Sequence, residues 1–137
     1  MTMIARASTA RSMIRLKIYF DGGCRPNPGK IETAVVARGE TYYRPDCGLG
    51  TNNDAEWLAL VHAADIARAI GLRNILFLGD SALVVGQASG ILKCRNASLQ
   101  SYLDSFNSIK SAFDSFGIRR IGRHQNLAGI ALEKRRL

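Results

Sequence analysis

The chain has 137 residues, of which 47% are hydrophobic and 22% charged, a composition typical of one globular domain and not of a disordered chain. Its longest apolar runs fall far short of the ~18 residues that a membrane-spanning helix needs, so no such helix is expected. The net charge of +8 at pH 7 favours a polyanionic partner, nucleic acid first and an anionic membrane surface second, over an inert basic surface.

The cysteines and the N-terminal residues bear on compartment and domain limits. Cys24, Cys47 and Cys94 lie far apart without a Cys-x-x-Cys pair, which is typical of reduced thiols in a cytoplasmic protein and gives no support for structural zinc. Residues 1–12 contain no acid and lack the apolar core of a secretory signal. We expect residues 1–13 to be an extension, disordered or upstream of the true start codon, and residues 14–137 to form the domain.

The first third of the domain predicts three strands. Residues 15–21 alternate in polarity, with Leu16, Ile18 and Phe20 on one face. A turn-rich loop follows at residues 24–29. Residues 33–38 and the stretch from residue 41 to residue 44 read as strands joined by a Gly-Glu turn, so an antiparallel meander is expected.

The remainder alternates helix and strand. A helix is predicted at residues 54–70, ended by Gly71, on an apolar stripe at helical spacing made of Trp57, Leu60, Val61, Ala64 and Ala67. Residues 74–78 form a continuously apolar strand, suited to a buried place beside the first strand. A short helix to about residue 89 follows.

The last predicted elements are a helix at residues 99–116 ended by Gly117, a strand at residues 118–122 and a helix at residues 128–135. A meander followed by alternating helices and strands predicts an α/β fold. We expect a five-stranded mixed sheet flanked by helices on both faces.

Three carboxylates recur near the ends of these elements. Asp21 ends the first predicted strand, Glu56 lies in the first turn of the long helix, and Asp80 ends the strand at residues 74–78. Ligands and chemistry gather at the carboxyl ends of strands in open α/β sheets, so all three are candidate metal ligands or general bases.

Each acid also has a structural interpretation. Asp21 can simply open an Asp-Gly turn. Asn53 and Glu56 have the spacing of a capping box, and Asp80 can cap the helix that it precedes. Taken one at a time, the acids therefore do not establish a site.

The residues around these acids form four motifs. Residues 21–29 read Asp-Gly-Gly-Cys-Arg-Pro-Asn-Pro-Gly, residues 51–60 read Thr-Asn-Asn-Asp-Ala-Glu-Trp-Leu-Ala-Leu, and residues 79–90 read Gly-Asp-Ser-Ala-Leu-Val-Val-Gly-Gln-Ala-Ser-Gly. Arg-His-Gln-Asn follows at residues 123–126. In order and spacing, these motifs resemble those of the type 1 ribonuclease H family, over about residues 14 to 137.

The resemblance implies a ribonuclease H-like fold and a metal-dependent endonuclease that hydrolyses the RNA strand of RNA–DNA hybrids. Asp21, Glu56 and Asp80 would be the catalytic and metal-binding residues, with Asp21 bridging two Mg²⁺ or Mn²⁺ ions. Two such ions about 4 Å apart stabilise the attacking and the leaving oxygen, and carboxylate oxygens suit these hard cations. The expected partner is an RNA–DNA hybrid bound by a monomer, with no membrane involved.

Further residues match family positions near the substrate backbone and carry amides or hydroxyls: Asn27, Thr51, Asn52 and Asn53. Such groups suit the 2′-hydroxyls and phosphates of an A-like hybrid. Lys93 and Arg95 are candidate phosphate contacts or an ordinary solvated face. No large insertion separates residue 90 from residue 99, so the basic protrusion of some family members is expected to be absent.

The resemblance fails at the family's fourth acid. That Asp lies four residues after the motif Asn126, where this chain has Ile130, and the preceding Gly129 is no acid either. Glu133, about one helical turn further on, is a candidate replacement ligand. Alternatively, Glu133 only balances neighbouring cations in solvent.

Two functions from different classes therefore stay open. One is the endonuclease with an atypical fourth ligand position, and the other is a catalytically weak ribonuclease H-like module that binds nucleic acid. His124 lies too close to Asn126 to match the family's mobile catalytic histidine and is interpreted as a surface residue. His62 is interpreted as structural.

Overall fold

The computed structural model describes residues 14–136, so the extension predicted at residues 1–13 lies outside the described residues. The elements are, in chain order, β1 (Leu16–Cys24), β2 (Gly29–Ala37), β3 (Glu40–Arg44), β4 (Leu49–Gly50), α2 (Asn52–Ala69), β5 (Asn74–Gly79), α3 (Ala82–Ala88), α4 (Ala97–Lys110), β6 (Ser115–Arg120), the 3-10 helix η1 (Arg123–Gln125) and α5 (Leu127–Arg136). The mixed α/β fold is the one expected from the sequence.

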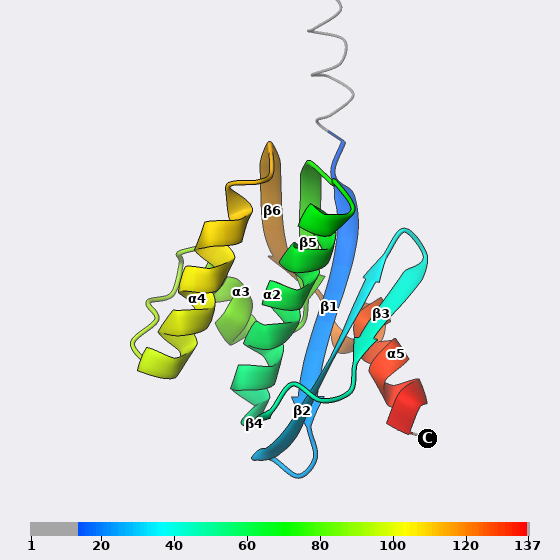
Figure 1. Cartoon of the computed structure of the whole chain (residues 1–137), viewed down its shortest axis with the longest axis vertical. Coiled ribbons are helices and arrows are strands. Elements are labelled where there is room, and N and C mark those ends of the chain that lie inside the picture. Colours follow the sequence, from blue (N-terminus) through cyan, green and yellow to red (C-terminus); the bar gives the residue numbers. More distant parts are fainter. Residues whose placement is uncertain (1–13, 137) are drawn as a thin grey trace, which may run out of the picture.

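The strands form one mixed sheet in the order β3-β2-β1-β5-β6, with β4 paired to β2 (Figure 1). β1 is central, antiparallel to β2 and parallel to β5, so the predicted pairing of the first strand with the strand at residues 74–78 is confirmed. The two-residue β4 makes six strands where five were predicted, because it forms within a stretch expected to be a loop.

Asp21 does not end its strand, contrary to the prediction. Parallel pairing with β5 stops at Tyr19 opposite Leu78, but β1 continues against β2 as far as Cys24. Because β5 ends at Gly79, Asp21 stands just beyond the edge of the parallel pairing while its backbone remains in the antiparallel ladder. β1 thus holds the Asp21 carboxylate just past the carboxyl end of β5, although β1 itself continues to Cys24.

Helices cover the two faces unequally. In Figure 1, α2 and α4 lie on one side of the sheet, and α5 lies beside β2 and β3. The larger core lies under α2 and α4, where the ring of Phe77 contacts those of Phe106, Phe113 and Phe116 at centroid distances of 5.8, 6.0 and 6.5 Å. α5 packs on β1 and β2 through a smaller core that includes Ala128 and Leu132.

The start of α2 differs from the capping box read from the sequence. Thr51 is the N-cap: its hydroxyl accepts from the backbone N–H of Asp54, and the Asp54 carboxylate accepts from the N–H of Thr51. The interpretation of Asn53 and Glu56 as the capping pair is therefore wrong. Glu56 lies beyond the first turn, and its carboxylate is free of any capping role.

The end of α2 is confirmed. Gly71 adopts a left-handed conformation (φ +77°), which glycine tolerates best. Its N–H donates to the carbonyl of Arg68, and the N–H of Leu72 donates to that of Ala67. These two hydrogen bonds together form a Schellman motif, which ends the helix.

The helix predicted at residues 99–116 is too long. α4 ends at Lys110, and Gly117 lies inside β6 instead of ending a helix. The carbonyl of Arg73 accepts from the N–H groups of Asp114 and Ser115, and β6 begins at Ser115 beside β5. Phe116, the last residue of the predicted helix, therefore reaches the core from a strand.

Within residues 14–136, none of the helices has the length and apolar character needed to cross a membrane. The connection between α3 and α4 is short, as expected from the sequence.

Candidate metal centre

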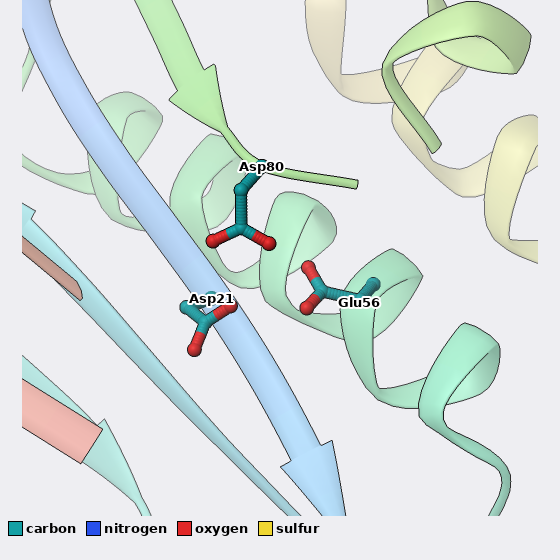
Figure 2. A group of neighbouring side chains, drawn as sticks. All are labelled: Asp21, Glu56 and Asp80. Atoms are coloured by element: carbon teal, nitrogen blue, oxygen red, sulfur yellow. The ribbon is translucent and has the colours of Figure 1, made fainter. Parts of the chain in front are cut away.

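Three carboxylates converge at one edge of the sheet. The side chains of Asp21, Glu56 and Asp80 offer ligand oxygens that lie within 4.8 Å of one another. Figure 2 shows them pointing toward a common space from β1, from α2 and from the residue after β5. Within the described residues, this is the only group of three or more acidic, histidine or cysteine side chains so arranged.

A glycine brings Glu56 to Asp21. A Cβ atom at Gly22 would lie 2.1 Å from the carbonyl oxygen of Ala55, closer than any side chain permits. The first turns of α2 can therefore pass directly over β1 only because residue 22 has no side chain. This contact accounts for the Asp-Gly pair at the start of the first motif.

The surroundings of Asp21 and Glu56 disfavour the charged form of both carboxyl groups. Burial, with a further contribution from the charge of Asp80, raises the pKa of Asp21 to about 6. Burial and the neighbouring Asp21 charge raise the pKa of Glu56 well above its ordinary value. Partly desolvated, mutually repelling carboxylates gain when a cation neutralises them.

The donor set fits a hard divalent cation. The Oε2 atom of Glu56 is buried and has no hydrogen-bond partner, so the fold leaves one oxygen available for a ligand. The ligand oxygens of the three carboxylates lie within 4.8 Å of one another, close to the span of about 4 Å that one ion with bonds of ~2.1 Å joins. Carboxylates are the ligands that Mg²⁺ and Mn²⁺ prefer.

Asp80 is not a helix cap, contrary to its structural interpretation. Ser81 is the N-cap of α3 and accepts from the N–H of Val84. Asp80 is instead bonded by Asn126, a fully buried residue whose amide nitrogen donates to the Asp80 carboxylate and to the carbonyl of Phe20, each at 3.0 Å.

The sequence placed Asn126 in a motif but assigned it no role. Its side-chain oxygen also accepts from the N–H of Ala128, which caps α5. An asparagine just before a predicted helix indicates a cap, but its second bond to Asp80 spans 46 positions and has no local signal.

The predicted nucleic-acid contacts separate into two groups. Asn52 and Asn53 line the hollow above the acids, and Asn27 accepts from the N–H of Asn52. Thr51 caps α2 beside them. The pair Lys93 and Arg95 lies in the connection between α3 and α4 and does not line this hollow.

The fourth acid is absent from the space where the family's pattern places it. A Cβ atom at Gly129 would lie 3.4 Å from Asp21 Oδ2, and Ile130 lines the hollow with 38% of its surface exposed. Glu133 also lines the hollow, but it is not one of the three converging carboxylates, and its Oε1 lies 3.6 Å from Arg25 Nη2 and 3.6 Å from Arg136 Nη1. The geometry thus favours the interpretation in which Glu133 balances neighbouring cations, because its carboxylate lies beside two guanidinium groups and outside the converging group.

The acids lie in a hollow of about 1190 Å³. Its lining includes five cationic residues: Arg25, Arg120, Arg123, Lys134 and Arg136. The sequence did not single them out as a group, because they come from different loops and from α5. They make the hollow attractive to a phosphate despite its acidic floor.

The two histidines take the roles expected. His62 is buried, and its Nδ1 lies 2.8 Å from the hydroxyl of Thr33. Burial, with a smaller effect of Arg44, lowers its pKa to about 4. His124 is exposed on η1.

Comparisons with known proteins agree with this geometry. A family model described as reverse transcriptase-like matches residues 20–135. The chain is 31% identical over 127 residues to ribonuclease HI of Halobacterium salinarum, covering 86% of this chain and spanning 62% of that relative's length.

This chain is similar to solved structures over most of their length. The crystal structure of RNase H1 from the halophilic archaeon Halobacterium salinarum NRC-1 matches with a TM-score of 0.77 and 30% identity, covering 87% of this chain and 94% of that one. LC11 RNase H1, crystallised in complex with an RNA/DNA hybrid, matches with a TM-score of 0.74 and 25% identity, covering 86% and 93%.

Proposed function

The chain belongs to the reverse transcriptase-like family and has the ribonuclease H fold, and we propose that it is a metal-dependent endonuclease that hydrolyses the RNA strand of RNA–DNA hybrids. The observation that carries the proposal is the convergence of Asp21, Glu56 and Asp80, with one buried Glu56 oxygen left unpartnered. The similar LC11 enzyme in complex with an RNA/DNA hybrid supports the substrate class.

Each residue of the centre has a distinct role in this proposal. Asp21, Glu56 and Asp80 would hold Mg²⁺ or Mn²⁺ through their carboxylate oxygens. Bound cations would supply the Lewis acidity that phosphodiester hydrolysis needs. Asn126 fixes one Asp80 oxygen and so limits the rotation of that carboxylate.

Substrate binding would use the polar and cationic wall of the hollow. The amides of Asn27, Asn52 and Asn53 and the hydroxyl of Thr51 suit the minor groove and phosphates of a hybrid. Arg120 and Arg123 would draw the strand toward the acids. Lys93 and Arg95 would contact phosphates at a distance from the cleavage site.

We further propose that the chain acts as a cytoplasmic monomer. Cys24, Cys47 and Cys94 are all unpaired thiols in the described part of the chain, which suits a reducing compartment.

One observation favours a second function, a nucleic-acid-binding module with weak or no cleavage. Gly129 and Ile130 supply no carboxylate beside Asp21, so a second ion would have fewer ligands. Because the first ion's three ligands are all present, the endonuclease is preferred.

The deciding experiment follows cleavage of a labelled RNA–DNA hybrid with Mg²⁺ and with Mn²⁺, beside duplex RNA and single strands. We expect the parent to cleave the RNA strand of the hybrid and Asp21→Asn to lose this cleavage. If the parent binds the hybrid but cleaves it with neither metal, the binding module is the better assignment. If Asp21→Asn cleaves as fast as the parent, these acids take no part in the reaction.

A further inference from the structure

A second, smaller hollow lies beneath the C-terminal turn of α5. Its volume is about 290 Å³, and its lining residues are Arg25, Lys30, Glu32, Tyr43, Pro45 and Arg136. Arg25 and Arg136 line the acid-containing hollow as well, so the two hollows share a wall. A chain lying over the acids can therefore continue into the smaller hollow across two guanidinium groups.

The Arg136 guanidinium is held in place from several sides. Its Nε donates to Glu32 Oε1, and the Tyr43 hydroxyl donates to the other Glu32 oxygen at 2.7 Å. Its Nη2 occupies the space where a Cβ atom at Gly23 would lie, at 2.7 Å. Only 18% of the side chain is exposed, so its fork is preorganised at the shared wall.

Positive charge dominates this end of the molecule. Around the smaller hollow and the last turn of α5, the cationic side chains are Arg25, Lys30, Lys134, Arg135 and Arg136, and the acidic ones are Glu32 and Glu133. Arg135 lies over the ring of Tyr43, 4.2 Å from its centroid. Five cations against two acids leave an excess of three positive charges, which suits an anion.

We propose that the smaller hollow binds a backbone phosphate of the nucleic acid whose cleaved phosphate lies over the acids. Arg136 and Arg25 would contact the strand at the shared wall, and Lys30, an exposed lining residue, would bind the phosphate as a point charge. Guanidinium forks and ammonium groups are the usual phosphate partners in proteins. The inference rests on the proposed function, because it assigns a further subsite to the same substrate.

Arg136 could instead serve only to tie α5 to β2, and a matched pair of variants separates these roles. Arg136→Gln and Glu32→Gln break the same ion pair, so a purely structural role predicts equal effects on hybrid binding. A phosphate contact predicts opposite effects. Arg136→Gln should weaken binding several-fold and lower the log–log salt slope by about one, whereas Glu32→Gln, which removes a competing anion, should bind as tightly as the parent or tighter.

Binding is measured without divalent metal, so that no strand is cut. Lys30→Gln probes the smaller hollow alone and should weaken hybrid binding, because Lys30 does not line the acid-containing hollow. Lys110→Gln, at the end of α4 near the Phe116 ring, removes the same charge away from both hollows and should bind like the parent.

Three results would overturn the subsite. In the first, Lys30→Gln and Arg136→Gln bind the hybrid as tightly as the parent. In the second, Arg136→Gln and Glu32→Gln weaken hybrid binding equally. In the third, Lys30→Gln and Lys110→Gln weaken hybrid binding equally. If the parent binds and cleaves hybrid in these cases, the proposed function stands and only the subsite is wrong. A parent that binds no hybrid at any salt concentration overturns both.

Discussion

The side-chain amide of Asn126 donates to the carboxylate of Asp80 over 3.0 Å and thereby joins the start of α5 to the end of β5. The same nitrogen donates to the carbonyl of Phe20, the residue before Asp21. One buried side chain thus positions two of the three elements that carry the acids. Residues that orient a ligand in this way typically account for 10–100-fold in metal affinity.

Replacing Asn126 should affect both the metal site and the fold. Asn126→Ala leaves Asp80 free to rotate and removes the cap of α5, so we expect metal affinity to fall about 10–100-fold and the free energy of unfolding to fall by about 1–3 kcal/mol. Titration calorimetry with Mn²⁺ and denaturant unfolding measure the two effects.

A matched control is Asn96→Ala, which removes the asparagine cap of α4 without touching the acids. It should cost about 1 kcal/mol of stability and leave metal affinity unchanged. Equal losses of metal affinity in both variants would show that Asn126 acts through general stability alone.

Without divalent metal, the contribution of Asp21 to the stability of the chain should fall as the pH rises from about 4 to 6. The pKa of Asp21 is about 6 in the folded chain and near 3.8 when unperturbed, so in this range the folded state binds the proton more tightly than the unfolded state does. Ionisation therefore costs the fold on the order of 3 kcal/mol. Glu56, whose pKa is also raised, acts in the same direction.

Asp21→Asn should remove the Asp21 part of this pH dependence, as read from denaturant unfolding in a chelating buffer. Saturating Mg²⁺ should oppose the loss in the parent, because the cation binds the charged carboxylates. A difference profile between parent and Asp21→Asn that is flat from pH 4 to 6 would contradict the raised pKa.

His62 should act in the opposite direction. Its pKa is about 4 in the folded chain against an ordinary 6.5, so the unfolded state binds the extra proton more tightly in this range. The stability that His62 contributes is complete above pH 6.5 and is lost toward pH 4, by about 3 kcal/mol. Denaturant unfolding of His62→Gln against the parent should isolate this loss, and parallel profiles would disprove it.

Adding a carboxylate at residue 130, where the family's fourth acid is missing, should raise the affinity of the centre for metal. Ile130→Asp introduces a carboxylate that lines the hollow near Asp21, so we expect tighter Mn²⁺ binding and faster cleavage at limiting metal. Glu133→Gln should leave metal affinity unchanged, because its carboxylate lies beside Arg25 and Arg136 and outside the group of converging acids. Calorimetry measures both variants.

Leu127→Asp is the control for the added charge. Leu127 is exposed on the same helix but does not line the hollow, so its variant should bind metal like the parent. Equal tightening by Leu127→Asp and Ile130→Asp would indicate a general electrostatic effect. A loss of metal affinity in Glu133→Gln would restore Glu133 as a ligand.

The sequence by itself determined the elements whose signals are local. Alternation along residues 15–21 predicted the central strand, because successive side chains of a strand face opposite sides. Gly71 ended α2 as expected, because a left-handed residue suits glycine. The three acids were predicted from their places near element ends and from the family resemblance of the motifs around them, and the structure brings them together.

The tertiary structure alone decided what depends on contacts distant in the chain. Phe116 belongs to a strand because β5 offers it a partner, although the predicted helix at residues 99–116 included it. Glu133 lies beside Arg25 and Arg136, a pairing that one helix cannot reveal because Arg25 comes from the loop between β1 and β2. The Asn126–Asp80 bond and the cationic walls of both hollows likewise need the packed sheet, since only packing brings separate elements within hydrogen-bonding distance.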